Sequence, residues 1–271
     1  MLATTVTSPA PSSLRRIVAI ARNTFREAVR DRVLYNLVVF VLLLSVCAIF
    51  LGAASASQDA KIIVDLGLSA MLFFGAFVAV FVGVGLVWKE IERRTVYAIF
   101  AKPVGRGEFL LGKYLGLCVT LAVNVAVMGA GVTLVLVYVV RGTTPLLLAL
   151  WPTIGLIYLE LTILTAVALL FSSFSSPVFA VFGSLAVFVI GHFTADLKGF
   201  AGLFDAAGVR GGLIALYYAL PNLSTFSQIT PAAYGVAPPP GHLAAALAYA
   251  AAWDVALLAG ATLLFARRDF K

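Results

Sequence analysis

The chain has 271 residues, of which 62% are hydrophobic and only 11% are charged. Soluble domains contain roughly 45–50% apolar and about 25% charged residues, so this composition excludes an ordinary soluble domain. The two cysteines, Cys47 and Cys118, exclude a disulfide framework, and the formal net charge of +7 requires an explanation from its distribution.

Long apolar segments dominate the sequence. A helix that crosses the hydrocarbon core of a membrane needs about 20 apolar residues and satisfies its own backbone polar groups in lipid. Six segments meet this length, at about 33–54, 65–87, 114–139, 146–171, 177–195 and 243–266. We therefore predict an all-α integral membrane protein with six transmembrane helices. Residues 1–13 are expected to form a disordered cytosolic tail, and residues 14–271 a single transmembrane domain.

Residues 14–32 form an amphipathic pattern ahead of the first span. At helical spacing the apolar residues around Leu14 share one arc, and five arginines share the opposite arc: Arg15, Arg16, Arg22, Arg26 and Arg30. This pattern favours a helix that lies in the membrane interface with its arginines toward water and phosphate. A solvated helix that merely precedes the first span is the alternative.

The second span contains Gly75, Ala79 and Gly83 at four-residue spacing. Small residues at this spacing allow helix backbones to approach closely in lipid, so the pattern indicates packing rather than chemistry. The turn between the fourth and fifth spans, 172–177, ends in Pro177, which suits the first position of a helix.

The connection between the second and third spans holds charges of both signs. Glu90, Glu92, Arg93 and Arg94 can open a short helix to about residue 101, whose second half is apolar on every side. The Pro-Gly turn at 102–107 then ends this helix, and Glu108 begins the next one, where a carboxylate suits the helix dipole. Lipid, the bundle itself or the cleft of a partner protein must cover the apolar half.

Residues 107–113 match the spacing of a phosphate-binding loop, G-x-x-x-x-G-K. Tyr114 replaces the Ser or Thr that would hold Mg²⁺, and no strand precedes the segment. We therefore expect no ATPase site in this chain, no bound cofactor and no enzymatic activity.

Two carboxyl groups fall within spans, Glu160 in the fourth and Asp254 in the sixth. A carboxylate at the centre of a membrane costs about 2.5–3.5 kcal/mol on insertion scales, so each should face the bundle interior. They can line a substrate or proton path, or they can hold helices together through a Ser, Thr or Tyr. No histidine or cysteine spacing points to a metal site.

The segment 196–242 mixes glycine-rich turns with apolar pieces too short to span, and prolines interrupt it. Short helices that dip into the outer leaflet or cap the bundle fit this composition best. With both termini in the cytosol, fifteen of the nineteen basic residues lie on the inner side, which is the positive-inside distribution. The charge therefore sets orientation and attracts lipid headgroups, and it does not indicate nucleic acid.

Several stretches taken together resemble the permeases of ABC-2 type transporters. They are EIERRT at 90–95, AKPVGR at 101–106, FLLGK at 109–113, FSSFSSP at 171–177, LPNL at 220–223 and FARRDF at 265–270. The likeness is strongest to the branch that matures multicopper enzymes and nitrous oxide reductase. It implies a six-helix permease with an N-terminal interfacial helix, a coupling helix after the second span and short re-entrant helices between the last two spans.

The resemblance also implies the partners and the mechanism. Two permease subunits, identical or homologous, would pair with two ATPase subunits that bind the ATP and Mg²⁺. The ATPase would dock on a coupling set of residues: Glu90, Glu92, Arg93, Arg94, Thr95, Lys102, Pro103, Arg106 and Glu108. We expect an exporter in a bacterial cytoplasmic membrane, in contact with lipid.

Two other functions stay open. One is an ion- or proton-coupled carrier that uses Glu160 and Asp254, and the other is a non-transporting permease that transmits force through 196–242. A membrane enzyme is the weakest alternative, because the sequence shows no constellation of nucleophile, base and metal.

Overall fold

The computed structural model describes residues 12–30, 37, 39–40, 43, 59–92, 105–140, 145–194, 199, 202 and 207–267. Within these ranges the regular structure is entirely helical. The first predicted span, about 33–54, and the middle of the coupling segment, 93–104, lie largely or wholly outside the described residues.

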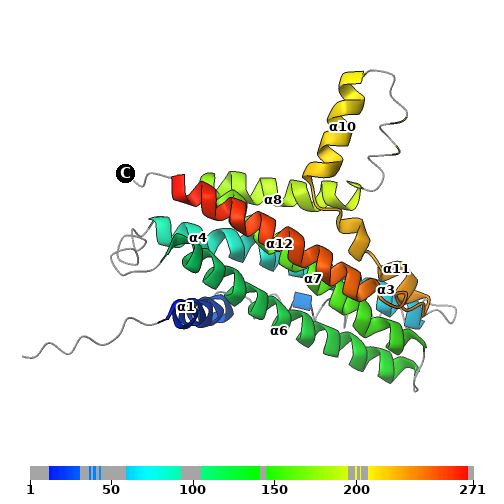
Figure 1. Ribbon diagram of the computed structural model, residues 1–271. Coiled ribbons are helices and arrows are strands. Elements are labelled where there is room, and N and C mark those ends of the chain that lie inside the picture. Colours follow the sequence, from blue (N-terminus) through cyan, green and yellow to red (C-terminus); the bar gives the residue numbers. More distant parts are fainter. Residues whose placement is uncertain are drawn as a thin grey trace, which may run out of the picture.

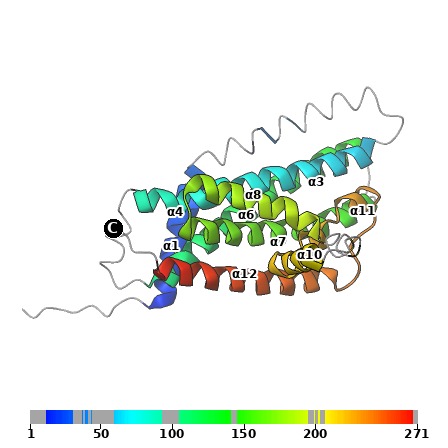
Figure 2. The same ribbon diagram turned by 90° about the horizontal axis from the view of Figure 1, so that it is seen from above.

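Long helices run side by side as a bundle (Figures 1 and 2). In chain order they are α3 (Asp59–Phe77), continued by the π-helical turn η2 (Val78–Val82) and α4 (Gly83–Glu92), then α6 (Arg106–Val140), α7 (Pro145–Phe174), α8 (Pro177–His192) and α12 (His242–Arg267). Four stretches among them are long and apolar enough to cross a membrane: Ala60–Leu86, Arg106–Tyr138, Pro145–Phe174 and His242–Phe265.

The second, third, fourth and sixth predicted spans are thus confirmed as long apolar helices. The fifth is a shorter apolar helix, α8, of 16 residues. At about 1.5 Å per residue it measures roughly 24 Å, less than the ~30 Å hydrocarbon core. Pro177 occupies the first turn of α8, directly after the tight turn that ends α7, as the sequence predicts.

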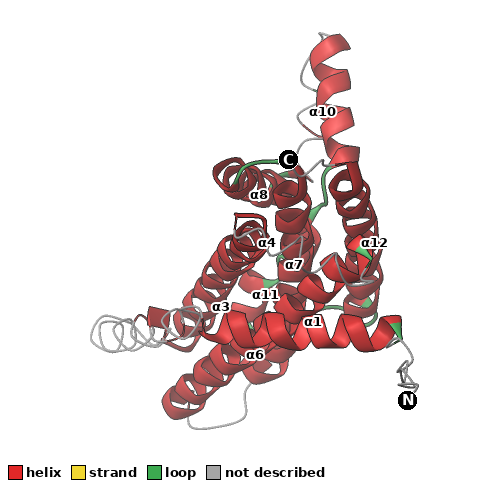
Figure 3. Cartoon of the chain, turned by 90° about the vertical axis from the view of Figure 1, so that its left-hand side faces the viewer, coloured by secondary structure: helices red, strands yellow, loops and turns green. Residues whose placement is uncertain are grey.

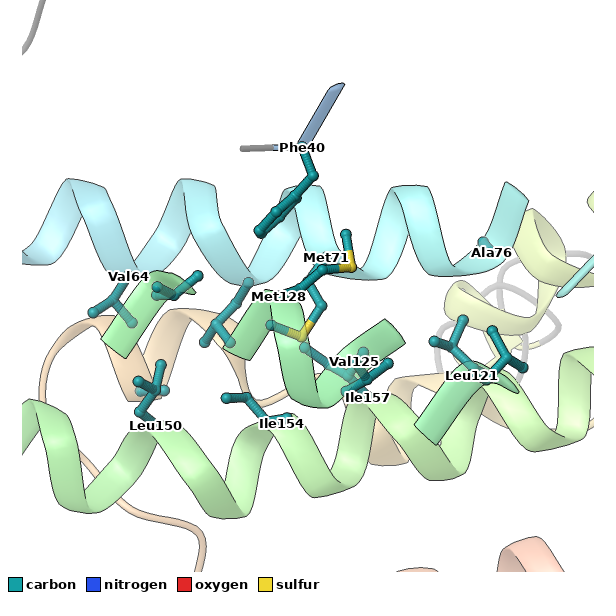
Figure 4. Close-up of a cluster of buried hydrophobic side chains, with 14 of the residues drawn as sticks. Phe40, Val64, Met71, Ala76, Leu121, Val125, Met128, Leu150, Ile154 and Ile157 are labelled. Carbon is teal, nitrogen blue, oxygen red and sulfur yellow. The ribbon is translucent and has the colours of Figure 1, made fainter. Parts of the chain in front are cut away.

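Helix α7 lies at the centre of the bundle, and its candidate span is the most enclosed of the four. Apolar side chains from α3, α6 and α7 form the largest core cluster (Figure 4), in which Met71, Met128 and Ile157 are buried. Phe40 packs edge-to-face against Phe74 with ring centroids 6.2 Å apart. The close packing expected of the second span is present, because a Cβ added at Gly75 would collide with Leu161 of α7.

Helix α1 (Ser13–Ala28) runs crosswise to the bundle at one end (Figures 1 and 3). It packs on α6 through Ile20, Thr24 and Ala28, of which Thr24 and Ala28 are fully buried. Leu14 and Val18 of the predicted apolar arc stay exposed. Figure 2 places the end of α4, α1 and the last turns of α12 at this same end, which we name the α1 end.

Short helices follow α8, as the sequence predicts for 196–242. They are α10 (Ala207–Ala219), the 3-10 turn η3 (Leu223–Phe226) and α11 (Ile229–Ala233). The last two cover the bundle, with Phe226, Ala232 and Ala233 buried. Helix α10 instead projects away from the bundle (Figures 1 and 3), leaving Val209 and Tyr218 exposed.

Candidate functional site

The coupling segment connects the end of α4 to the start of α6. Glu90 and Glu92 are the last residues of α4 rather than the first residues of a separate helix, so the predicted helix start at residue 90 is wrong. No Gly or Pro interrupts the chain between Gly85 and Glu92, and the spanning helix therefore continues through both glutamates. Arg93, Arg94, Thr95, Lys102 and Pro103 lie outside the described residues.

The second arm of the segment is well defined because α6 begins with a capped turn. Gly105 precedes the helix, and its backbone N–H donates to Oε2 of Glu108 at 3.2 Å. Glu108 is the third residue of α6, so this is the return contact of a capping box. The helix starts at Arg106, slightly earlier than predicted, and its acidic first turn complements the helix dipole.

Glu108 also joins α6 to α1. Arg16 donates from Nε to Glu108 Oε2 at 2.9 Å and from Nη2 to Oε1 at 2.8 Å. A forked guanidinium–carboxylate contact of this kind fixes orientation as well as distance. The hydrogen bond with Glu108 raises the pKa of Arg16 above its ordinary value. Arg16 was predicted to face water and lipid phosphate; the structure pairs it instead with a residue of the coupling set.

The other arginines of the interfacial set behave as predicted in one respect, since they are exposed: Arg15, Arg22, Arg26 and Arg30. Residues from two separately predicted sets, the interfacial helix and the coupling segment, therefore meet at the pair Arg16–Glu108.

Below this pair the backbones of α1 and α6 touch. A Cβ added at Gly112 would lie 2.7 Å from Ile20, and one added at Gly116 would lie 2.6 Å from the carbonyl oxygen of Ala21. Two glycines one turn apart thus allow the helices to approach more closely than side chains permit. We name this contact, formed by residues 13–28 and 105–116, the α1–α6 junction.

A second charge contact lies in the junction. The Nζ of Lys113 is 3.7 Å from Oε2 of Glu27, and the Lys113 side chain is only 1% exposed. Lys113 is the lysine of the G-x-x-x-x-G-K spacing, and residues 107–113 lie within the continuous helix α6. The segment does not form the loop that phosphate binding through this motif requires.

Arg106 fastens the start of α6 to the end of α12. Its Nη1 donates to the carbonyl oxygen of Phe265 at 3.0 Å. The rings of Phe109 and Phe265 stack nearby, with centroids 6.2 Å apart. The arm of the coupling segment that enters α6 is therefore held by both the N-terminal helix and the last helix of the bundle.

Glu160 faces the interior of the bundle, as predicted, and is 1% exposed. Its Oε1 lies 3.2 Å from Nε2 of His192 on α8, but among the described residues no hydrogen bond of good geometry satisfies this oxygen. His192 Nδ1 is 2.9 Å from the carbonyl oxygen of Phe188. A carbonyl oxygen can only accept, so Nδ1 donates to it. A favourable contact between Nε2 of His192 and Oε1 of Glu160 then needs a proton between these two atoms.

Asp254 lies on the other side of α7. Its Oδ2 is 3.2 Å from the hydroxyl of Thr162, which also contacts the carbonyl oxygen of Leu159 at 2.7 Å. The hydroxyl of Tyr114 on α6 also interacts with this carboxyl group, while Oδ1 of Asp254 has no hydrogen-bond partner in the part of the chain that the structure describes. The contact fits the predicted alternative in which a Thr or Tyr holds the carboxyl group between helices.

Sequence reasoning missed several partners. It did not pair Glu160 with His192, although an imidazole and a carboxyl group in neighbouring spans are natural partners for each other in lipid. It also missed Ser13, whose hydroxyl accepts from Arg16 at 3.1 Å. Helical spacing along α1 could have found this contact, because Ser13 precedes Arg16 by three residues.

The described structure defines the class of protein. It is an all-helical, multi-pass membrane protein in which the basic helix α1 and the start of α6 meet at one end of the bundle. A search of the curated proteins finds no match. The family model "ABC-2 family transporter protein" matches residues 18–270. The chain therefore belongs to the ABC-2 transporter family, as the resemblance implied, and is a membrane transport component of the kind that normally works with an ABC ATPase subunit.

Proposed function

We propose that the chain is the permease subunit of an ATP-driven exporter, and that residues 90–108 receive the mechanical work of a separate ATPase. The observation that supports this proposal most is the anchoring of the second arm. Arg16 holds Glu108 through two hydrogen bonds, and Arg106 holds the end of α12. Force applied to the segment between α4 and α6 would therefore be transmitted to both α1 and α12.

The proposed topology follows the charge distribution. The α1 end, with its exposed arginines and the arm at Arg106, faces the cytosol of a bacterium, and both termini lie there. Helix α1 lies in the membrane interface with Leu14 and Val18 toward lipid, since both are exposed apolar residues on a basic helix. Two permease copies with two ATPase subunits complete the transporter, and ATP and Mg²⁺ bind to the ATPase subunits.

Co-purification tests the ATPase partner. Tagged full-length chain should bring down an ABC ATPase from gentle detergent extracts, and deletion of 93–104 should abolish this association. Recovery of the ATPase with the deletion variant at the wild-type level would contradict the proposed docking site.

A charge exchange tests the anchoring. Arg16→Glu should uncouple ATP hydrolysis from transport while leaving the ATPase bound, because only the arm's attachment to α1 is broken. The double variant Arg16→Glu with Glu108→Arg should recover coupling, and Arg15→Gln, at an exposed neighbouring arginine, is the matched control. Failure of the double variant to recover any coupling would contradict a role for the ion pair.

A proton- or ion-coupled carrier is the second candidate. It is favoured by the buried oxygens of Glu160 and Asp254 that have no hydrogen-bond partner within the described ranges. This candidate predicts that transport in vesicles follows an imposed ion gradient without ATP and is lost in Glu160→Gln.

A force-transmitting role without transport is the third. It is favoured by α10, an apolar helix that projects from the bundle. Deletion of 207–219 would then abolish binding of an outer partner while ATPase stimulation persists.

A further inference from the structure

Residues of α3 and α11 line a half-open pocket. These two helices meet at the end of the bundle opposite α1 (Figures 1 and 2). Its volume is about 350 Å³, and its lining comprises Lys61, Ile62, Asp65, Leu66, Thr230, Ala233 and Tyr234. This volume suits a small polar group rather than a large cargo. The pocket takes no part in the coupling arm or in the contacts of Glu160 and Asp254.

The pocket presents opposite charges that do not neutralise each other. The Nζ of Lys61 lies 3.7 Å from the centre of the Tyr234 ring, a cation–π contact, and Lys61 takes part in no ion pair among the described residues. Asp65, one turn further along α3, takes part in no ion pair among the described residues. Thr230 of α11 adds a hydroxyl group to the lining of the same pocket.

An apolar face of α3 begins at the edge of the pocket. Leu66 and the aromatic residues Phe73, Phe77 and Phe81 follow at spacings of seven and four residues, so they share one side of the helix. Each is more than a third exposed, and the rings of Phe77 and Phe81 stack 5.3 Å apart. A charged pocket at the start of α3 is thus followed along the helix by an exposed apolar stripe. A phospholipid has the same arrangement, because its charged headgroup is followed by apolar acyl chains.

We propose that this pocket binds the headgroup of an ethanolamine phospholipid, with its acyl chains along the stripe of α3. Lys61 and Thr230 bind the phosphate, as an ammonium and a hydroxyl that both donate to it. Asp65 accepts from the primary ammonium of the headgroup. A choline headgroup offers no N–H donor to Asp65, and a glycerol headgroup offers no positive charge, so both should bind more weakly.

Lipid retention by the full-length chain tests the proposal. The protein is exchanged in nanodiscs of phosphatidylcholine that contain equal minor fractions of phosphatidylethanolamine and phosphatidylglycerol, and the lipids that stay bound are counted by native mass spectrometry. The wild type should retain phosphatidylethanolamine preferentially. Asp65→Asn should reduce this preference about tenfold, because a loss of this size corresponds to one hydrogen bond between charged groups.

Two further variants separate the phosphate from the ammonium. Lys61→Gln should weaken retention of all three lipids to a similar degree, because each contains a phosphate. Thr230→Val should give a smaller reduction, and it serves as the second pocket variant if Asp65→Asn does not fold. The matched control is Arg210→Gln on α10, which removes an exposed positive charge outside the pocket and should leave the preference unchanged.

Two results would overturn the proposal. One is equal retention of the three lipids by the wild type and the pocket variants, because this result would mean that the lipids are bound only as unspecific boundary lipid. The other is displacement of the lipid by soluble phosphoethanolamine as readily as by the lipid itself, which describes a site for a free zwitterion. Neither result bears on ATPase co-purification, so this inference and the proposed function succeed or fail separately.

Discussion

The α1–α6 junction and the interior around α7 use polar groups in opposite ways. In the junction two ion pairs form, Arg16 with Glu108 and Lys113 with Glu27. Around α7, Glu160 lies beside an imidazole and Asp254 beside hydroxyl groups. Among the described residues, neither Oε1 of Glu160 nor Oδ1 of Asp254 has a hydrogen-bond partner.

This difference separates a fixed contact from an adaptable one. Close backbone packing and forked hydrogen bonds have one good arrangement, so the junction suits a rigid attachment. A buried carboxyl group with unused acceptor capacity is costly unless water, a proton or another ligand satisfies it. The interior is therefore where a change of state can occur, whereas in the proposed function the junction transmits motion.

The largest expected effect is steric and lies in the junction. Gly116→Ala should destabilise the folded chain by about 3 kcal/mol, the upper end for overpacking, because the new methyl group meets the backbone of Ala21. Gly131→Ala on the same helix is the matched control, since open space surrounds it. Thermal unfolding in detergent measures both, and equal midpoints would show that the junction is not closely packed.

An intermediate effect is expected around α7. His192→Phe should cost about 2 kcal/mol, because it leaves the buried carboxyl group of Glu160 without its polar neighbour. Adding Glu160→Met should restore the thermal midpoint, since an apolar pair of similar size needs no hydrogen bond.

The same double variant sharpens the comparison. If the pair only holds α7 to α8, the stable double variant should transport normally. A stable but inactive double variant would instead give the pair a part in transport, in agreement with an adaptable interior. An unstable double variant would contradict the pairing itself.

The smallest effect concerns Asp254. Thr162→Val should cost about 1 kcal/mol more than Thr165→Val, because both hydroxyls donate to a backbone carbonyl but only Thr162 also meets a carboxyl group. Thermal unfolding of the two variants under identical conditions gives the difference. A difference of zero would show that Asp254 relies on Tyr114 alone.

The sequence predicts the long helices well because uninterrupted apolar runs of about 20 residues have few other solutions in lipid. It assigns Glu90 and Glu92 to the start of a new helix although they lie at the end of α4, because charged residues fit the end of a spanning helix as well as the start of a new one. Hydropathy marks where apolar segments end, but it does not show where a helix ends.

The site was predicted as separate sets whose contacts follow only from the fold. Nothing local to Arg16 indicates Glu108, which is 92 residues away in the chain. Glycine spacing in the second span predicts close packing against a neighbour, but Gly112 and Gly116 drew no such prediction because they lie beside a charged segment. Partner identity, as for Glu160 and His192, depends on which helices are adjacent.

The proposed function requires the start of α6, at Gly105, to face the side of the membrane on which a cytosolic ATPase can act. Single cysteines are placed at Gly105, beside the arm, and at Tyr234, at the opposite end, after replacement of Cys47 and Cys118. A membrane-impermeant maleimide is then applied to intact cells and to inverted membranes. We predict labelling of Tyr234→Cys in intact cells and of Gly105→Cys only in inverted membranes; labelling of Gly105→Cys from outside intact cells would contradict the account.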